Sequence, residues 1–564
     1  MTLPYSHTPS GRLLWVYQGG VHLPDRKDLS NGTAIAQAEI PLRLILPLQQ
    51  HIGRPAEPLV KPGDRVLKGE KLARGAGIVS ASLHAPTSGL VREIAHHPIP
   101  HASGLTAPCI LLEPDGEDRW GELPPPLPEF AELDPGKVIE RIRWAGIVGM
   151  GGAGFPSAVK LAPGPERAIH TLIINGAECE PYITCDDRLM REQADKIVKG
   201  IRILRHVLDV TGECLIGIED NKPEAIVAMR RALAEEDLDS TEVVVIPALY
   251  PSGGEKQLIR ILTGREVPSR GIPAHIGIVC HNVATAAAVA DAVLEGRPLI
   301  SRVVTLTGGG LVQPGNRDVL LGTLAADLIA MQGGYRPGVD RLILGGPMMG
   351  QALGSDQVPI TKGGNCLLVP GPGELPDPGP AIACIRCGRC ADACPMQLLP
   401  QQMYWYARAR DMDKVQEYNL FDCIECGCCS HVCPSHIPLV QYYRFAKTSI
   451  WGLEAERRKA ERARQRHESR QQRLERQEQD RKAKLRKKNE ALQDKPAAEP
   501  AADPKKAAIE AALQRAKEKK AKLAQEGVAP QNTAQLTEAQ QRQIREADQR
   551  RAEAAVVQHN ETSE

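Results

Sequence analysis

The sequence predicts a multidomain α/β protein, and three observations carry this prediction. The chain has 564 residues, more than one hydrophobic core usually serves. Its middle third alternates short apolar strands with polar loops and helices, which is typical of a parallel sheet. The third observation is a cluster of cysteines, because nine of the 15 fall between Cys384 and Cys433. We therefore expect a separate cysteine-rich domain after the sheet.

Composition excludes several classes of protein. Formal net charge is +1, from 70 basic and 69 acidic residues, and aromatic residues make up 3% of the chain. Neither value favours nucleic-acid binding. We find no run of about 18 apolar residues that could cross a bilayer, and the first residues do not have the pattern of a secretory signal. One dense group of thiols in a long chain of this kind indicates metal binding in a reducing compartment.

The first domain is predicted over residues 1–125. The stretches "PLVKPGDRVLKGEKLA" and "HAPTSGLVREI" resemble the two halves of a biotinyl/lipoyl-type barrel sandwich, with short strands and tight turns. A swinging-arm carrier has a lysine at the hairpin tip, and "RGAGIVSASLH" between the halves contains none. We therefore interpret the module as structural. A proline-rich linker is expected over residues 126–136.

A glycine-rich stretch follows the linker, "GIVGMGGAGFPSAVK" at residues 146–160. Gly149, Gly151 and Gly154 have the G-x-G-x-x-G spacing of a dinucleotide-binding turn. The flanking sequence does not suit that turn, because a helix is predicted before it and Phe155-Pro156 delays any helix after it. On this stretch alone, a glycine turn without a ligand and a phosphate-binding loop remain alternatives.

Three further loops follow predicted strands. They are "NGAECEPY" after "AIHTLIING", "YPSGGEKQL" after "EVVVIPAL", and "HNVATAAAV" after "HIGIVC". Each loop alone could be an ordinary turn. The carboxyl ends of parallel strands share one edge of a sheet, so the loops together predict a ligand site at that edge.

The cysteine block contains two copies of C-x2-C-x2-C-x3-C-P, "CIRCGRCADACP" and "CIECGCCSHVCP". This is the spacing of [4Fe-4S] ligands, in which three thiolates come from one loop and the fourth ligates the other cluster. We assign one cluster to Cys384, Cys387, Cys390 and Cys433, and the other to Cys423, Cys426, Cys429 and Cys394. Structural zinc is disfavoured, because zinc sites usually pair separated two-cysteine elements. Cys428 is either a spare buried thiol, which we favour, or a competing ligand.

Helices are expected on both sides of the second cysteine run, which favours a helical ferredoxin-like domain. From about residue 451 the composition shifts to Glu, Lys, Arg, Gln and Ala without an apolar stripe. We expect residues 451–564 to form a charged helical or disordered tail. A docking segment for a partner is the functional alternative.

The four loops, in their order, resemble the flavin- and NADH-binding subunit of respiratory complex I. With "GGVHLPDRK" near the N-terminus and the double cysteine run, residues 10–445 are similar to the C subunits of the Rnf (Rsx) family of ion-translocating electron transport complexes. This resemblance implies a Rossmann-like FMN/NADH domain over residues 137–300 and a β-grasp domain over 301–368. A domain with two [4Fe-4S] clusters then covers residues 369–450.

The resemblance also implies binding residues. Those for FMN would be Gly149, Gly151, Gly152, Gly154, Lys160, Asn175, Glu178, Tyr250, Gly254, Glu255, Asn282 and Thr285. Phe155 and Glu180 match positions associated with NADH. The sequence departs from the complex I pattern at Met150, where that pattern has arginine, and at Ala177, where it has an acidic residue.

The function implied is electron transfer between NADH and ferredoxin-type carriers, through FMN and the two clusters. The chain would belong to a membrane-bound, ion-translocating complex, peripheral on the cytoplasmic face of the bacterial inner membrane. Its expected partners are the membrane subunits and an iron–sulfur subunit or ferredoxin, with no nucleic acid. The alternatives are a soluble NADH-dependent diaphorase subunit and an iron–sulfur relay scaffold without flavin.

Overall fold

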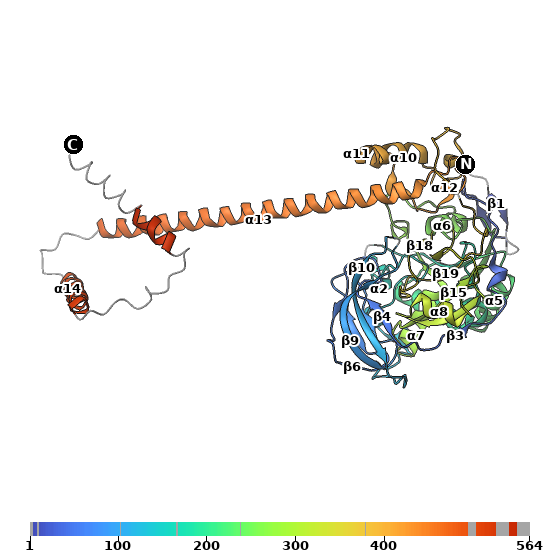
Figure 1. Cartoon of the computed structure of the whole chain (residues 1–564), viewed down its shortest axis with the longest axis horizontal. Helices are drawn as coiled ribbons and strands as arrows, with labels where there is room; N and C mark the ends of the chain where they lie inside the picture. The colour runs from blue at the N-terminus through green and yellow to red at the C-terminus, as the bar shows by residue number, and fades with distance from the viewer. Residues whose placement is uncertain are drawn as a thin grey trace. The chain divides into compact units, whose positions relative to one another are not determined.

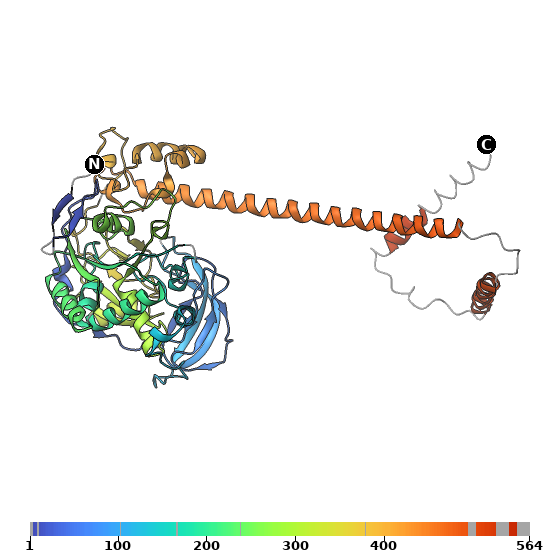
Figure 2. The same ribbon diagram turned by 180° about the vertical axis from the view of Figure 1, so that it is seen from behind.

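The computed structural model describes residues 4–7, 11–101, 103–164, 167–236, 238–377, 379–493, 504–525 and 541–549. The chain divides into two compact units between Arg457 and Arg458. The first unit holds the five sheets found among the described residues and every cysteine. The second unit is helical where it is described (Figures 1 and 2).

A barrel sandwich forms the first part of unit 1, built from two antiparallel sheets (blue in Figure 1). One sheet has the order β4 (Leu44–Pro47), β10 (Thr106–Pro114), β9 (Gly89–Pro98) and β6 (Arg65–Val66). The other has the order β5 (Glu57–Pro58), β7 (Lys71–Arg74) and β8 (Leu83–His84). Apolar side chains from both sheets form a shared core that includes Leu44, Leu72 and Ile110, none of them exposed. The alternating apolar residues of these strands therefore face one another across the two sheets and form one core.

The predicted parallel sheet forms the centre of unit 1. Its order is β13 (Thr241–Ile246), β12 (Glu213–Glu219), β11 (Thr171–Gly176) and β14 (Ile278–Asn282), all parallel. Its helices are α1 (Pro135–Trp144), α2 (Ser157–Lys160), α3 (Cys185–Glu192), α4 (Ala194–Val207), α5 (Pro223–Glu236), α6 (Glu255–Thr263) and α7 (Val283–Leu294). Separate apolar cores lie on the two faces of the sheet, which explains why its strands are apolar throughout.

The glycine loop joins helix α1 to the short helix α2 and is not preceded by a strand. The three other predicted loops leave the carboxyl ends of β11, β13 and β14. Because those three strands are parallel, their loops emerge at one edge of the sheet. The loop of the remaining strand, β12, ends at the same edge and was not singled out from the sequence.

A six-stranded mixed sheet follows the parallel sheet in the chain. Its order is β18 (Gln351–Leu353), β17 (Leu342–Leu344), β19 (Cys366–Leu368), β15 (Ser301–Thr307), β16 (Gly315–Leu320) and β3 (Ala36–Gln37), with helix α8 (Ala325–Met331) between β16 and β17 in the chain. Strand β3 comes from the N-terminal segment and pairs with β16 in parallel. The hairpin of β1 (Pro4–His7) and β2 (Leu13–Trp15) contacts helix α6 through β2. The N-terminal segment is thus shared among several domains.

The cysteine domain is helical, as the sequence predicts. Its helices are α9 (Arg389–Asp392), α10 (Pro400–Ala409), α11 (Met412–Glu417), α12 (Cys428–His431) and the start of α13 (Leu439–Gln493). Tyr443 of α13 is completely buried and donates its hydroxyl to the Pro400 carbonyl at 2.7 Å. Helix α13 continues into unit 2, where its side chains over residues 458–490 are exposed, and α14 covers Pro504–Gln525. Among the described helices, none is both long and apolar enough to cross a bilayer.

Candidate iron–sulfur and flavin sites

The eight cysteines assigned to clusters surround two separate cavities. Cys384, Cys387, Cys390 and Cys433 line a cavity of about 300 Å³, and we call them the outer set. Cys394, Cys423, Cys426 and Cys429 line a smaller one of about 20 Å³, and we call them the inner set. Each cavity takes three cysteines from one run and the last cysteine of the other run. The structure therefore brings the thiols together in the crossed arrangement expected from their spacing.

The two cysteine loops repeat the same backbone conformation. Arg386 and Glu425 both have φ of 58°, and Gly388 and Gly427 follow at φ of 82° and 83°. Left-handed residues at these two positions turn the loop so that three cysteines face one centre. Non-glycine residues seldom adopt this conformation, so its occurrence in both runs supports a ligand-binding loop in each. A cubane with four thiolate ligands suits these donor sets.

The inner and outer sets differ in exposure. Cys394, Cys426 and Cys429 are 7–9% exposed, whereas Cys387 of the outer set lies at the surface. Cys428 is completely buried against Tyr250 and lines neither cavity. Its thiol contacts that of Cys426 of the inner set, so the interpretation as a spare thiol stays a prediction.

The inner set lies against the parallel-sheet domain. The hydroxyl of Tyr250 donates to the carbonyl of Cys426 at 2.7 Å. From helix α6, Lys256 pairs with Asp422 at 3.3 Å and Gln257 donates to the Met396 sulfur at 3.0 Å. The third predicted loop and the helix after it therefore hold the inner cysteines beside the carboxyl edge of the sheet.

The glycine loop closes on itself and leaves its tip open. Gly149 N–H donates to the Phe155 carbonyl at 2.8 Å, and Gly154 N–H donates to the Gly149 carbonyl at 3.2 Å. Between them Gly151, Gly152 and Ala153 are exposed, and no described residue accepts their N–H groups. A β-carbon at Gly152, where φ is 113°, would meet nothing within 4 Å. Successive free N–H groups at an open tip form a cradle suited to an anion.

Helix α7 begins directly beside this cradle. Thr285 Oγ1 accepts the Met150 N–H at 3.0 Å, and Asn282 caps the helix by accepting the Ala284 N–H at 2.9 Å. A β-carbon at Gly151 would lie 3.4 Å from Asn282. The first and fourth predicted loops are thus in contact. The N-terminus of a 12-residue helix adds positive potential to the cradle, so these residues fit the phosphate of FMN.

The third loop is joined to the second loop and to helix α2 through predicted residues. Asn175 donates its amide to the Gly253 carbonyl at 2.8 Å, and Lys160 pairs with Glu255 at 2.5 Å. Gly254 precedes helix α6, where a side chain would lie 2.5 Å from Gln257 Oε1. Of the two positions expected near NADH, Phe155 is half-buried, and Glu180 accepts the N–H groups of Met348 and Met349 at 2.7 and 3.0 Å.

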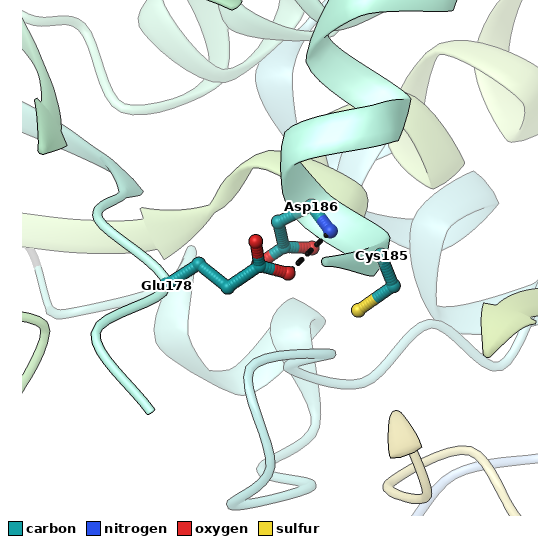
Figure 3. Close-up of side chains that lie close together, drawn as sticks. All are labelled: Glu178, Cys185 and Asp186. Carbon is teal, nitrogen blue, oxygen red and sulfur yellow. Dashed lines mark hydrogen bonds between the residues drawn. The ribbon is translucent and has the colours of Figure 1, made fainter. Parts of the chain in front are cut away.

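Glu178 has a role that the sequence did not indicate. Its carboxylate accepts the N–H group of Asp186 at 2.7 Å (Figure 3). It also accepts that of Asp187 at 3.2 Å and so caps helix α3. Burial raises its pKa to about 8, against the opposing effect of Lys27. Glu178, Cys185 and Asp186 hold their ligand atoms within 4.8 Å of one another. Capping accounts for this proximity, because both oxygens of Glu178 already have N–H donors.

Several buried charged residues near the loops were missed by sequence reasoning. Lys27 donates to the carbonyls of Glu178, Glu180 and Ile183. After strand β12, Lys222 pairs with Glu219 at 3.0 Å, and Glu219 also accepts from Ser252 at 2.6 Å. The polar loop after β12 could have been predicted as its neighbours were, from its place at the carboxyl end of a parallel strand. Lys27 could not, because a lysine that binds distant carbonyls leaves no local sequence pattern.

Lys362 joins three parts of unit 1. It is completely buried, and its ammonium donates to the carbonyls of Ser82 and Gly146 at 2.7 and 2.6 Å. Ser82 belongs to the barrel sandwich and Gly146 to the root of the glycine loop. Burial lowers the pKa of Lys362 to about 7.

This pKa predicts a pH-dependent stability. Between pH 7 and 9 the unfolded chain keeps the Lys362 proton while the folded chain releases it, so stability rises with pH. Over this interval we expect wild type to gain about 2 kcal/mol relative to Lys362→Met. Anaerobic urea unfolding at several pH values measures this difference, and a difference that is constant or shrinks with pH contradicts the prediction.

Comparisons with known proteins match three segments of the chain. Residues 15–117 match the RnfC barrel sandwich hybrid domain, residues 142–291 the Nuo51 FMN-binding domain, and residues 383–437 the 4Fe-4S dicluster domain. The chain therefore carries an FMN-binding domain and a dicluster domain after a barrel sandwich.

A weaker likeness exists to a solved structure. The crystal structure of NAD⁺-reducing [NiFe]-hydrogenase in the air-oxidized state superposes with a TM-score of 0.39 at 20% identity, covering 50% of this chain and 54% of that one.

Curated relatives are much more similar to the chain, and the three described next are each named as the C subunit of an ion-translocating oxidoreductase complex. The protein from Pseudomonas aeruginosa is 52% identical over 83% of this chain and 60% of its own length. That from Vibrio cholerae is 49% identical over 91% and 65%, and that from Yersinia pestis 48% over 82% and 73%. The chain thus spans 60–65% of the length of the first two relatives. On this identity and coverage, the chain belongs to the RnfC family, the C subunits of ion-translocating oxidoreductase complexes.

Proposed function

We propose that this chain is the NADH-side electron-input or output subunit of a membrane-bound complex. The complex would couple electron transfer between NADH and ferredoxin-type carriers to ion translocation. The observation that carries this proposal is the contact between the two kinds of site. Tyr250 of the flavin-domain loops donates a hydrogen bond to the backbone carbonyl of Cys426 in the inner set. Relatives named as subunits of an ion-translocating oxidoreductase complex support it.

FMN and two [4Fe-4S] clusters are the cofactors of the proposal. When bound, FMN exchanges two electrons with a nicotinamide and single electrons with iron–sulfur clusters. The chain's own residues would hold its phosphate with the N–H groups of Gly151–Ala153 and the start of helix α7. Asn175, Lys160 and Glu255 would brace the neighbouring loops, and Phe155 and Glu180 would lie on the NADH side. Hydride transfer needs no side-chain acid or base, so we assign no catalytic residue.

The exposure of the cysteines suggests an order for the clusters. Three of the four inner cysteines are buried beside the flavin-domain loops, whereas no outer cysteine is buried and Cys387 is exposed. Ile382 and Ile385 next to the outer set are 58% and 63% exposed. Apolar side chains around an exposed cluster suit a docking face. We therefore place the iron–sulfur subunit or ferredoxin at the outer set, and the NADH side at the opposite end of the path.

The proposal also covers the domain boundaries of the chain and its location in the cell. We assign residues 137–300 to the FMN/NADH domain, 301–368 to a β-grasp domain and 369–450 to the ferredoxin-like domain. We assign no function to the tail over residues 451–564. We place the chain on the cytoplasmic face of the inner membrane, held there by the membrane subunits, because the relatives' name implies a membrane complex.

A relay scaffold without flavin is the second candidate, and one observation favours it. Met150 and Ala177 have apolar side chains that are 4% and 0% exposed. Neither therefore offers a polar group to a cofactor. Anaerobic purification followed by denaturation decides between them. Release of about one FMN per chain supports the flavoprotein, and clusters without releasable FMN support the scaffold.

A further inference from the structure

Arg302 reaches from the mixed-sheet domain to the underside of the glycine loop. It lies on strand β15 and is 3% exposed. Its guanidinium donates to the carbonyl of Met150 at 3.2 Å and to that of Lys362. Within the described part of the chain, no carboxylate lies within ion-pair distance of it, and the buried Asp186 carboxyl interacts with it over a longer distance. A buried guanidinium keeps its positive charge, so this charge stands directly behind the loop.

The contact with Met150 fixes the direction of the next N–H group. In a planar trans peptide the carbonyl and the N–H point in opposite directions. Because Arg302 holds the Met150 carbonyl on the inner side, the Gly151 N–H of the same peptide points away from Arg302. Gly151 lies on the exposed side of the loop. Arg302 thus turns one donor of the cradle outward.

The other groups of Met150 are also committed to the protein. Its N–H donates to Thr285, and its side chain is buried in the core beneath the sheet. The carbonyl of Lys362 also accepts from Arg302, and its ammonium donates to the Gly146 carbonyl at the start of the loop. The loop is therefore fixed from behind at two points, while its N–H groups at Gly151, Gly152 and Ala153 find no acceptor among the described residues. A rigid set of donors with a positive charge behind it fits an anion.

We propose that Arg302 is a positioning residue for the phosphate of FMN, which it serves by aiming the Gly151 N–H at the phosphate and adding positive charge behind the loop. This inference rests on the proposed function, because it requires FMN in the cradle. It also gives the loop a cation at a position where the Met150 side chain supplies none.

Flavin binding by Arg302 variants tests the proposal. Dissociation constants for FMN and for riboflavin, which lacks the phosphate, are measured by fluorescence quenching on the flavin-depleted, cluster-containing chain. For Arg302→Met we expect FMN to bind about 10- to 100-fold more weakly and riboflavin to change by less than about threefold. Arg302→Lys keeps the positive charge but loses the forked geometry of the guanidinium. Its FMN affinity should therefore lie between those of wild type and Arg302→Met. Arg341→Met is the matched control, because Arg341 is in the same domain, pairs with its neighbour Asp340 and makes no hydrogen bond to the glycine loop within the described residues.

The outcomes separate this inference from the proposed function. Wild type that binds neither flavin contradicts the proposed function itself. Wild type that binds FMN, with Arg302→Met binding it equally well, overturns the inference alone. Equal weakening of FMN and riboflavin also overturns it, because Arg302 would then only support the fold. Cluster signals report folding of each variant, and if Arg302→Met does not fold, a selective loss of FMN in Arg302→Lys carries the same decision.

Discussion

Replacing Cys433 by alanine should abolish the cluster that begins at Cys384 and preserve the one that begins at Cys423. Cys433 lines the outer cavity with Cys384, Cys387 and Cys390, although it lies in the second run of the sequence. A cubane that loses one of four thiolates is exposed to solvent and unstable. The iron content should fall from about eight to about four atoms per chain.

Signal matching identifies which cluster is lost. In dithionite-reduced samples, the EPR signal missing from Cys433→Ala should be the one missing from Cys384→Ala and retained in Cys423→Ala. Cys428→Ala is the control, since Cys428 is a buried thiol of the same run that lines neither cavity. A Cys433 variant that matches Cys423→Ala would show that each run binds its own cluster.

Replacing Lys27 by methionine should destabilise unit 1 by roughly 3–5 kcal/mol. Lys27 is 3% exposed, and its ammonium donates to three carbonyls, at 2.8 Å to Glu178, 3.2 Å to Glu180 and 2.6 Å to Ile183. Methionine has nearly the same length but no donor, so one buried carbonyl, that of Ile183, and two part-buried ones lose their partner at once. The second loop should then lose its fixed shape.

Anaerobic urea unfolding of the cluster-containing chain measures this effect. Lys61→Met is the matched control, because Lys61 is exposed in the barrel sandwich and should change stability by less than about 0.5 kcal/mol. A Lys27 variant whose unfolding midpoint matches that of the Lys61 variant would contradict the importance given to this buried ammonium.

Lys27, Arg302 and Lys362 show what the sequence could not indicate. Each is a buried basic side chain that binds backbone carbonyls about 60 to 280 positions away, and carbonyls carry no sequence signal. By contrast, the cysteine runs and the loops at Asn175 and Asn282 have side chains whose spacing or place after a strand reflects their chemistry. Those features were therefore predictable.

The N-terminal segment gives the same lesson for the fold. The barrel sandwich and the parallel sheet follow from local patterns of apolar residues and turns. Strand β3 has only two residues, and its pairing with β16 spans some 280 positions. Such a pairing depends on the packed domains and not on the short strand itself. Glu178 is similar, because its capping of α3 depends on where that helix begins.

NADH reduction of a variant without the inner cluster tests the proposed order of the clusters most directly. Cys423→Ala and wild type, both containing FMN, are titrated anaerobically with NADH and then with dithionite, and each cluster is followed by EPR. In wild type NADH should reduce the outer cluster. In Cys423→Ala the outer cluster should stay oxidised with NADH and become reduced with dithionite. Rapid reduction of the outer cluster by NADH in that variant, or clusters in FMN-containing wild type that NADH never reduces, would contradict the proposed path.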